Sequence, residues 1–535
     1  MRNYLAIATI LLSSSNVWGQ TFSTVFSTEF KETRDLDFWA HLYSDPSSHY
    51  VLFTESTDEQ FTPILQKYDR AFNLGFSQEL EVGEHRRFAG VFYARQKFIM
   101  AADQTDTKAK IKNYYATVVG LDGKSLPSRE VASIPYKTDE NRPLHVTWRS
   151  SEDTSKILLA DWASEDIESN QTELHLTVMD NQLQRLWSRM VILPYIPKQY
   201  YSRKVAVSND GQVFIYAKIF DLADKNAKPK KRRLLPSYQS LIFRFSPDQP
   251  DFQTIKLGPV DKTVSNTTFR LTNAGQMFCV GLYSSGPDEP IEGLFFKRVN
   301  EQTGAVEVET QKVFTKEEIA GLTLEKTKSK VEGLHHDFTI NWFVFQGDGS
   351  VLGVAEYISF NTTTTTNAKG IPIRNVHYYT NGEALLLKIQ ADGAFKWTRQ
   401  INKKQRFIDT KEIKRTVTLI KPKSRVHNFN GYSILEGSEE GVYIFYNEDK
   451  DQIGEAIDGK ARLIDNFKDA TIAAVQIKTD GQLRRKAVSD AAIKANALLL
   501  HSYSRQISSN EMFFISSEAK ILGTNKIRMG VVRVD

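Results

Sequence analysis

KIQADGAFKWTRQI (residues 388–401) reads as one short strand, a tight turn at Asp392-Gly393 and a second strand. Asp-Gly suits a hairpin turn because glycine accepts a positive φ without steric cost and aspartate can hydrogen-bond to its own backbone. Similar stretches are VVGLDGKSLPSREV (118–131), TVMDNQLQRLWSRMV (177–191) and VQIKTDGQLRRKAV (475–488). The sequence therefore predicts a repeated β-hairpin.

Two classes of turn alternate along the chain. The first class occurs at residues 69–70, 122–123, 180–181, 246–248, 302–304, 392–393 and 480–481. A second class precedes it, most clearly at 209–211, 273–275, 347–349 and 508–510. Each repeat then reads strand A, tight turn, strand B, longer connection, strand C, tight turn, strand D. The spacings of 53, 58 and 68 residues between Asp69, Asp122, Asp180 and Asp248 are typical of four-stranded propeller blades.

The predicted fold is all-β, a single β-propeller of eight four-stranded blades, with seven blades as the alternative. MGVVRVD (529–535) resembles AVQIKTD (474–480), so the last blade lacks its outermost strand. We expect residues 20–33 to pair with 526–535, which would close the ring and leave no unpaired strand edge. The predicted propeller domain is 20–535, with blades at 38–83, 86–135, 145–195, 202–258, 263–314, 335–405, 425–490 and 495–535.

The first nineteen residues read as a signal peptide. Arg2 precedes an apolar run, and Val17-Trp18-Gly19 places small residues at the −3 and −1 positions of a cleavage site. We therefore expect an exported protein, periplasmic or extracellular. No later stretch is long and apolar enough for a transmembrane helix. Cys279 is the single cysteine, so an intrachain disulfide is impossible, and its apolar surroundings predict a buried, inert thiol.

Composition excludes some classes of function. The 535 residues are 41% hydrophobic and 11% aromatic, which is enough for a large core. The formal net charge of +5, from 69 basic and 64 acidic residues, is too mild and dispersed to indicate nucleic acid. The sequence has no G-x-S-x-G, H-E-x-x-H, P-loop or Rossmann motif, and no sialidase-type box or WD dipeptide. Catalytic residues are therefore unassigned, and no cofactor is predicted.

The two faces of the predicted ring differ. A–B and C–D turns share one face and are short, whereas B–C and D–A connections share the other. The second set contains the insertions, which are 221–237, 284–292, 315–334, 359–380, 402–426 and 447–468. Because loops on a rigid scaffold commonly carry function, this long-connection face is the predicted binding face. Neutral drift of exposed loops is the alternative. Residues 315–334 suggest a short helix or a charged loop.

Candidate ligand-binding residues lie in or beside these connections. KNAKPKKRR (225–233) has positive charges suited to an anionic surface, although a solvated loop explains them as well. Aromatic residues near a central funnel suit stacking on sugar rings or peptide side chains, or they pack the loops onto the blades. The candidates are Lys228, Lys230, Lys231, Arg232, Arg233, Trp162, Tyr200, Tyr201, His377, Tyr378 and Tyr379.

No metal site is predicted. His335-His336-Asp337 is placed at the start of a strand, where successive side chains point to opposite faces and two adjacent histidines do not easily share an ion. NEDKDQIGEAID (447–458) faintly resembles an EF-hand loop, but Gln452 replaces its required glycine and Asp458 its terminal glutamate. A solvated acidic loop is the better interpretation.

The repeats resemble β-propeller proteins in general. The Gly19-Gln20 leader end and the D-G-x-x-x-W phrase at Asp392–Trp397 resemble, more narrowly, uncharacterised exported propellers of Bacteroidota-type bacteria. The resemblance covers the whole mature chain, but its motifs are structural and transfer no functional residue. We expect a non-catalytic binding or scaffold propeller of the cell envelope whose partner is an envelope protein or glycan. The alternative is a hydrolase or lyase acting on a polysaccharide or peptide, with acidic residues in the central funnel.

Overall fold

The structure is a computed structural model, and the chain is built almost entirely from β-strands. The predicted signal peptide lies outside the part that can be described. The described residues are 21–31, 36–56, 61–136, 146–164, 171–222, 237–287, 289–322, 333–346, 348–366, 372–412, 429–437, 441–457, 459–465, 469–488, 497–517 and 526–535.

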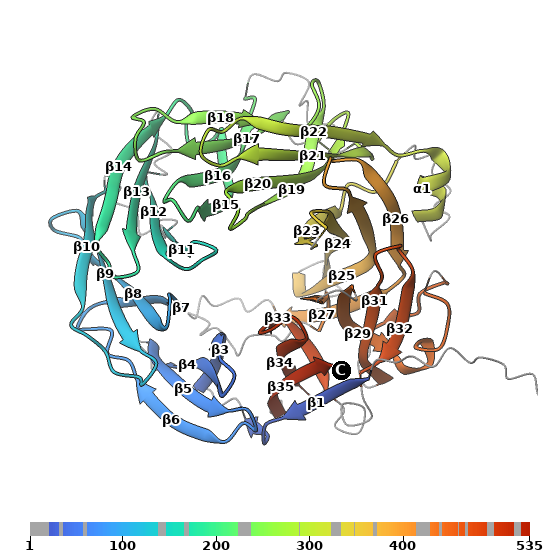
Figure 1. The fold of residues 1–535 in the computed structure, drawn as a ribbon, viewed down its shortest axis with the longest axis horizontal. Coiled ribbons are helices and arrows are strands. Elements are labelled where there is room, and N and C mark those ends of the chain that lie inside the picture. The colour runs from blue at the N-terminus through green and yellow to red at the C-terminus, as the bar shows by residue number, and fades with distance from the viewer. Residues whose placement is uncertain are drawn as a thin grey trace, which may run out of the picture.

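The described strands form eight sheets, numbered here in chain order, that lie side by side around a common centre (Figure 1). In sheets 1 to 5 the first strand is innermost and the fourth is outermost. Sheet 1 is β3 (Leu36–Ser44), β4 (Ser48–Ser56), β5 (Phe61–Asp69) and β6 (Leu74–Glu79). Sheet 2 is β7 (Arg87–Tyr93), β8 (Lys97–Asp106), β9 (Ile111–Gly120) and β10 (Arg129–Pro135). Sheet 3 is β11 (Val146–Ser150), β12 (Lys156–Ser164), β13 (Thr172–Asp180) and β14 (Arg185–Leu193).

The remaining sheets continue around the centre. Sheet 4 is β15 (Tyr200–Val207), β16 (Val213–Phe220), β17 (Tyr238–Phe245) and β18 (Gln253–Lys256). Sheet 5 is β19 (Thr263–Leu271), β20 (Gln276–Ser284), β21 (Ile291–Asn300) and β22 (Val306–Val313). Sheet 6 is β23 (Phe338–Phe345), β24 (Val351–Thr366), β25 (Pro372–Ile389), β26 (Phe395–Ile401), β27 (Lys404–Glu412) and β30 (Leu463–Ile464). Sheet 7 is β28 (Ser433–Glu436), β29 (Val442–Asp449), β31 (Ala470–Ile477) and β32 (Leu483–Ala487). Sheet 8 is β33 (Leu498–Gln506), β34 (Glu511–Ser517), β35 (Lys526–Val534), β1 (Phe22–Phe26) and β2 (Phe30–Lys31).

Apolar clusters join each sheet to the next. Phe98 of sheet 2 packs with Leu52 of sheet 1, and similar clusters of buried residues connect the later sheets in turn. One cluster joins sheet 7 to sheet 8, and another joins sheet 8 to sheet 1 through Phe513 and Phe53. The two faces of each sheet are thus both buried against neighbouring sheets, which explains the long apolar runs in the middle strands.

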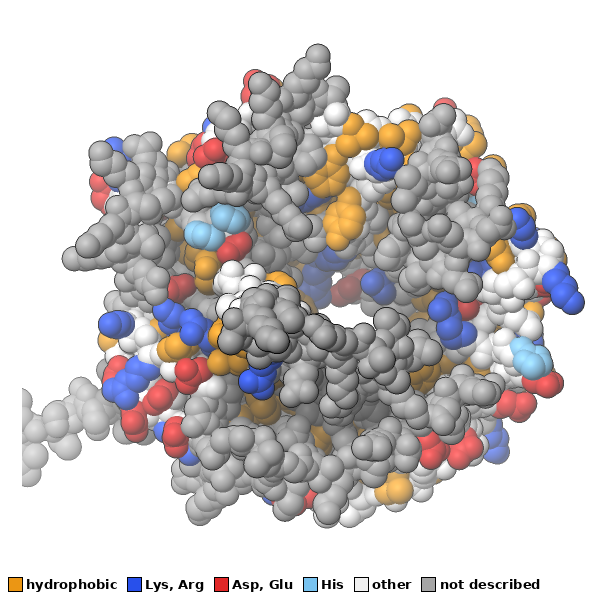
Figure 2. All heavy atoms as spheres, turned by 180° about the vertical axis from the view of Figure 1, so that it is seen from behind, with side chains coloured by type: hydrophobic (Ala, Val, Ile, Leu, Met, Phe, Trp, Pro, Cys, Tyr) orange, Lys and Arg blue, Asp and Glu red, His pale blue; other side chains and the backbone are white. Residues whose placement is uncertain are grey.

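The two faces of the ring carry different connections. The A–B turns, such as 208–212 and 272–276, are short and end the inner strands on one side. Figure 2 views the other side, where the inner strands begin and the longer connections run, and shows Lys and Arg side chains at part of the edge of a central hollow. This arrangement agrees with the predicted difference between the faces. Whether the long-connection face binds a partner stays a prediction.

Sheet 8 combines strands from both ends of the chain. β1 runs antiparallel to β35 with Phe22 opposite Val534, and β2 continues the pairing with Phe30 opposite Ile527. The pairing of these two segments that the sequence predicts is therefore present. Phe22 is buried and packs edge-on against the rings of Tyr443 and Phe445 in sheet 7.

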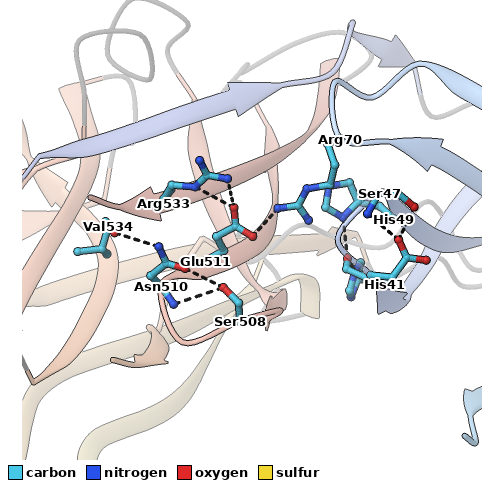
Figure 3. Close-up of polar contacts among 11 residues, drawn as sticks. His41, Ser47, His49, Arg70, Ser508, Asn510, Glu511, Arg533 and Val534 are labelled. Atoms are coloured by element: carbon cyan, nitrogen blue, oxygen red, sulfur yellow. Dashed lines mark hydrogen bonds and ion pairs between the residues drawn. The ribbon is translucent and has the colours of Figure 1, made fainter. Parts of the chain in front are cut away.

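Glu511 connects sheet 8 to sheet 1 (Figure 3). Its buried carboxylate accepts hydrogen bonds from Arg533 on β35 and from Arg70 in the β5–β6 turn. Burial opposes the charge, but these hydrogen bonds hold the pKa of Glu511 below its ordinary value. On the adjoining β4, His49 accepts or donates a 2.6 Å hydrogen bond with Ser44, and burial lowers the pKa of His49 to about 4.

Two predicted insertions are partly strands instead of loops. β24 extends to Thr366 and β25 begins at Pro372, so most of 359–380 is a β-ribbon, with β27 as its third strand. Threonine is β-branched and favours extended backbone, which explains why the NTTTTT tract continues the strand. The sequence analysis placed this tract in the long connection 359–380 and ended the sixth blade at 405, within β27.

The described residues of the other connections contain little regular structure. α1 (Lys316–Leu322) supplies the short helix expected within 315–334, and residues 323–332 lie outside the described part. A single 3-10 turn, η1 (Lys450–Gln452), occupies the acidic connection at 447–458. None of the described helices is long and apolar enough to cross a membrane. Cys279 is fully buried on β20, and burial raises the pKa of its thiol to about 12, as expected for an inert cysteine.

Candidate functional site

The first group of predicted aromatic residues is mostly inaccessible. Trp162 on β12 is only 4% exposed and lies in the apolar cluster between sheets 3 and 4, which agrees with the alternative that these aromatic residues pack against the blades; a ligand role for Trp162 stays a prediction. Its Nε1 donates to the hydroxyl of Tyr200 at 3.4 Å, and Tyr200 is half-buried against Phe243. Tyr201 points the other way along β15 and is 47% exposed. The alternation of a strand separates the two tyrosines.

His377, Tyr378 and Tyr379 lie on β25 within the ribbon and are half-buried. The His377 ring stacks on Phe360, and its Nδ1 is 2.9 Å from the Thr362 hydroxyl. Tyr379 also packs near Phe360, with ring centroids 4.9 Å apart. These side chains stabilise the ribbon, although the 56% exposed Phe360 leaves an apolar ring on its surface. A ligand role for them stays a prediction.

The basic candidates Lys228, Lys230, Lys231, Arg232 and Arg233 lie outside the described residues. His335 and His336 do not begin a strand, because β23 starts at Phe338 and both histidines precede it. The alternation argument against a shared ion therefore does not apply. Their rings stack with centroids 4.3 Å apart, and each has a ring nitrogen 3.4 Å from a carboxylate oxygen of Asp337. The prediction of no metal stays untested.

A large pocket opens on the long-connection face between sheets 1, 2 and 3, and we call it the rim pocket. Its volume is about 1460 Å³, and its lining includes the connection 80–86, Trp39, Arg87, Phe88, Asp103, Trp148 and Arg149. The lining residues come from the starts of β3, β7 and β11 and the end of β8. Pockets for drug-sized ligands have volumes of about 300–1,000 Å³, so the rim pocket is large enough for an oligosaccharide or a peptide segment.

Aromatic and charged groups alternate in the rim pocket. Trp39 contacts Phe88 edge-on at 5.6 Å between ring centroids. The guanidinium of Arg87 lies 2.9 Å from the carboxylate of Asp103, which is buried at the pocket wall. Arg149 has no carboxylate partner among the described residues, and burial lowers its pKa. The site thus offers flat apolar faces beside hydrogen-bonding groups.

A buried acidic centre lies behind this wall. Tyr114 donates a hydrogen bond to Asp161, and burial raises the pKa of Asp161. Burial lowers the pKa of Lys112, whose ammonium lies 5.2 Å from the Tyr114 ring centroid. Asp161 is fully buried and does not line the pocket, so a substrate cannot touch it in this conformation. Asp161 is therefore not available as an acid or base to a ligand in the rim pocket, whose own lining includes the acidic residues Glu79, Glu81, Glu84 and Asp103.

A second pocket, which we call the channel pocket, lies inside the ring near the short A–B turns. Its volume is about 470 Å³, and it is lined by Glu152, Lys204, Thr268, Arg270, Trp342 and Phe343 among others. These residues come from the inner strands β15, β19 and β23 and from the turn after β11. The channel pocket is thus on the opposite side of the ring from the predicted binding face.

Sheets 6 and 7 contain buried ion pairs outside both pockets. Lys403 pairs with Glu356, and both side chains are buried. Arg485 pairs with Glu448 at 3.0 Å, and both are again buried. Each charge is compensated by its partner, so these pairs are structural rather than available to a ligand.

Comparison with known proteins gives only distant structural likenesses. No protein-family model and no curated protein matches the sequence. Similar solved structures include β-propeller domains, among them the WD40 domain of SCAP from fission yeast, at a TM-score of 0.36 and 6% identity, covering 96% of this chain and 98% of that one. The propeller domain of the trilobed protease from Pyrococcus furiosus gives a TM-score of 0.28 and 9% identity over 69% of this chain and 96% of that one. Puromycin hydrolase gives a TM-score of 0.32 and 12% identity, and the match covers 65% of this chain. This chain spans about half the length of that enzyme.

Sequence reasoning missed the residues of both pockets. They come from sheets far apart in the chain, and no local motif joins them. One signal was present: Lys204 and Arg270 interrupt apolar inner strands, SRKVAV and FRLT. A charged residue within such a strand must face water or a partner, and in a ring the water is in the channel.

Proposed function

We propose that this protein is an exported, non-catalytic binding propeller of the cell envelope, with eight blades closed by the N-terminal strand, and that it holds a glycan in the rim pocket. The eight sheets among the described residues support the proposed blade count, and the β1–β35 pairing supports the proposed closure. The observation that carries the glycan assignment is the combination of Trp39, Phe88 and Trp148 with the Arg87–Asp103 pair in one large pocket.

Aromatic side chains beside charged, planar polar groups are the combination that binds sugars. The C–H faces of a sugar ring pack on aromatic side chains, and its hydroxyls need planar polar groups such as carboxylates and guanidinium groups. Arg87 and Asp103 already bind one another, so they are held in place before a ligand arrives. Such preorganisation reduces the entropy cost of binding.

The test is calorimetric titration of a panel of neutral and acidic envelope oligosaccharides. We expect at least one to bind, and Trp148→Ala to weaken it by about tenfold, which corresponds to about 1.4 kcal/mol. Arg87→Met should weaken the same ligand. Leu126→Ala is the matched control, because Leu126 is 58% exposed on an outer turn remote from the pocket lining.

Two results would overturn the proposal. If the wild type and Trp148→Ala bind the oligosaccharide with equal affinity, the rim pocket is not the glycan-binding site. Appearance of shorter oligosaccharides during incubation, detected by chromatography, would assign catalysis instead. If only a protein is captured from envelope extracts and no oligosaccharide binds, the scaffold function would replace the glycan-binding one.

A further inference from the structure

The channel pocket contains two cations with different surroundings. Arg270 on β19 is fully engaged: its Nη1 lies 2.8 Å from Glu436 Oε1 and its Nη2 lies 3.0 Å from Glu152 Oε1. The two carboxylates come from sheets 7 and 3, so Arg270 connects three sheets across the inside of the ring. Its charge is neutralised by protein, and its position is fixed.

Lys204 on β15 has no such compensation. Its Nζ donates to the Thr268 hydroxyl at 3.2 Å and to the Phe269 carbonyl, both neutral acceptors. No carboxylate among the described residues lies within ion-pair distance of it. An ammonium has three N–H donors, so the two contacts leave one for a further acceptor. The side chain is reached by water from the channel.

The surroundings of Lys204 disfavour the positive charge of its ammonium group. Partial enclosure of the side chain by the protein is the main cause that lowers its pKa to about 8, although water still reaches the ammonium, and the nearby charges of Arg149 and Arg270 lower the pKa further. Glu152 and Cys279 act in the opposite direction, but Glu152 is committed to Arg270, and the Cys279 thiol is protonated because burial raises its pKa to about 12. A bound anion would relieve this imbalance.

Trp342 supplies the second half of the site. It lies on β23 in the same pocket and is 48% exposed, which is unusual for an inner-strand tryptophan. Phe343 and Leu271 extend the apolar lining. The volume of about 470 Å³ falls within the usual range for small-molecule sites.

We propose that the channel pocket is a second binding site, for a small organic anion that carries a ring, with Lys204 as its charge partner and Trp342 as the surface on which the ring packs. This site shares no lining residue with the rim pocket, although Arg149 of the rim pocket lies near enough to Lys204 to act on its charge. The anionic group is a carboxylate or a phosphate, since a single lysine binds either as a point charge.

The test is titration with three probes: benzoate, inorganic phosphate and uncharged benzyl alcohol. Benzoate should bind at pH 7, and benzyl alcohol should bind at least tenfold more weakly. Lys204→Met should reduce benzoate affinity at least tenfold, Lys204→Arg should keep most of it, and Trp342→Ala should reduce it for benzoate but not for phosphate. Lys124→Met is the matched control, because Lys124 is 88% exposed on an outer turn.

The pH dependence identifies the charge partner. Because the pKa of Lys204 is about 8, benzoate should bind more weakly at pH 9 than at pH 7 to the wild type. The Lys204→Arg variant should lose this dependence, since a guanidinium stays charged. Equal binding of benzoate by wild type and Lys204→Met, or of benzoate and benzyl alcohol by the wild type, would overturn the proposal. If Lys204→Met does not fold, the pH profiles of wild type and Lys204→Arg decide it: parallel profiles refute the role of Lys204.

Discussion

Replacement of Phe22 by alanine tests how much the pairing of β1 contributes to stability. Phe22 is 8% exposed and contacts two aromatic rings of sheet 7 at 6.0 Å between centroids. Burying a phenylalanine side chain contributes about 1.5–3 kcal/mol, and each edge-to-face ring pair adds about 0.5–1.5 kcal/mol. Core Phe→Ala substitutions cost about 3–5 kcal/mol. Because β1 is an outer strand where water can fill the gap, we expect a loss near the lower limit, about 3 kcal/mol.

The assay is equilibrium urea unfolding followed by circular dichroism and tryptophan fluorescence. The matched control is Val25→Ala on the same strand, whose side chain is 47% exposed and should change the free energy of unfolding by less than about 0.5 kcal/mol. A variant without residues 20–31 should lose more stability than Phe22→Ala. If Phe22→Ala and Val25→Ala are indistinguishable from wild type, β1 does not hold sheet 8 to sheet 7, and the reasoning on closure fails.

Three further predictions concern buried charges. Because the pKa of Glu511 is lowered on folding, its stabilisation is present above about pH 4.5 and disappears as pH falls through the folded-state value; Glu511→Gln should flatten this acid dependence of the melting temperature. Lys403→Met should cost about 3–5 kcal/mol because it leaves the Glu356 carboxylate buried without a partner, and adding Glu356→Leu should recover most of the loss in urea titrations. His49 should titrate near pH 4 in histidine NMR spectra, and its contribution should lower stability as pH falls from about 6.5 through about 4; a midpoint near 6.5 would contradict its burial.

Local chemistry predicted much of the strand arrangement. Asp392-Gly393 and Asp480-Gly481 form turns with the glycine at φ of 89° and 87°, as the hairpin pattern requires. The pairing of residues 22–26 with 530–534 also followed from the pattern, because a missing outer strand at one end matched a surplus strand at the other. The ribbon at 351–389 was missed because a threonine tract has the composition of a loop but the backbone preference of a strand.

The pockets were harder to predict for a geometric reason. Trp162 seemed available near the end of its strand, but alternation turns it into the cluster between sheets 3 and 4. Arg87 and Trp148 are separated by a complete sheet in sequence, and their convergence depends on how neighbouring sheets are placed around the centre. No periodicity along the chain encodes that placement.

The eight apolar clusters have a consequence for how the molecule comes apart. Seven clusters are each shared by two neighbouring sheets, and the eighth joins sheets 8 and 1 and also includes Ile464 of sheet 6 and Ala470 of sheet 7, so no sheet has a separate core of its own. Unfolding of one sheet would expose the apolar side chains that both neighbouring sheets bury against it. Those neighbours would then be destabilised in turn. Slowly exchanging amides should consequently be spread evenly around the circle, without a resistant module on which partial proteolysis would stop.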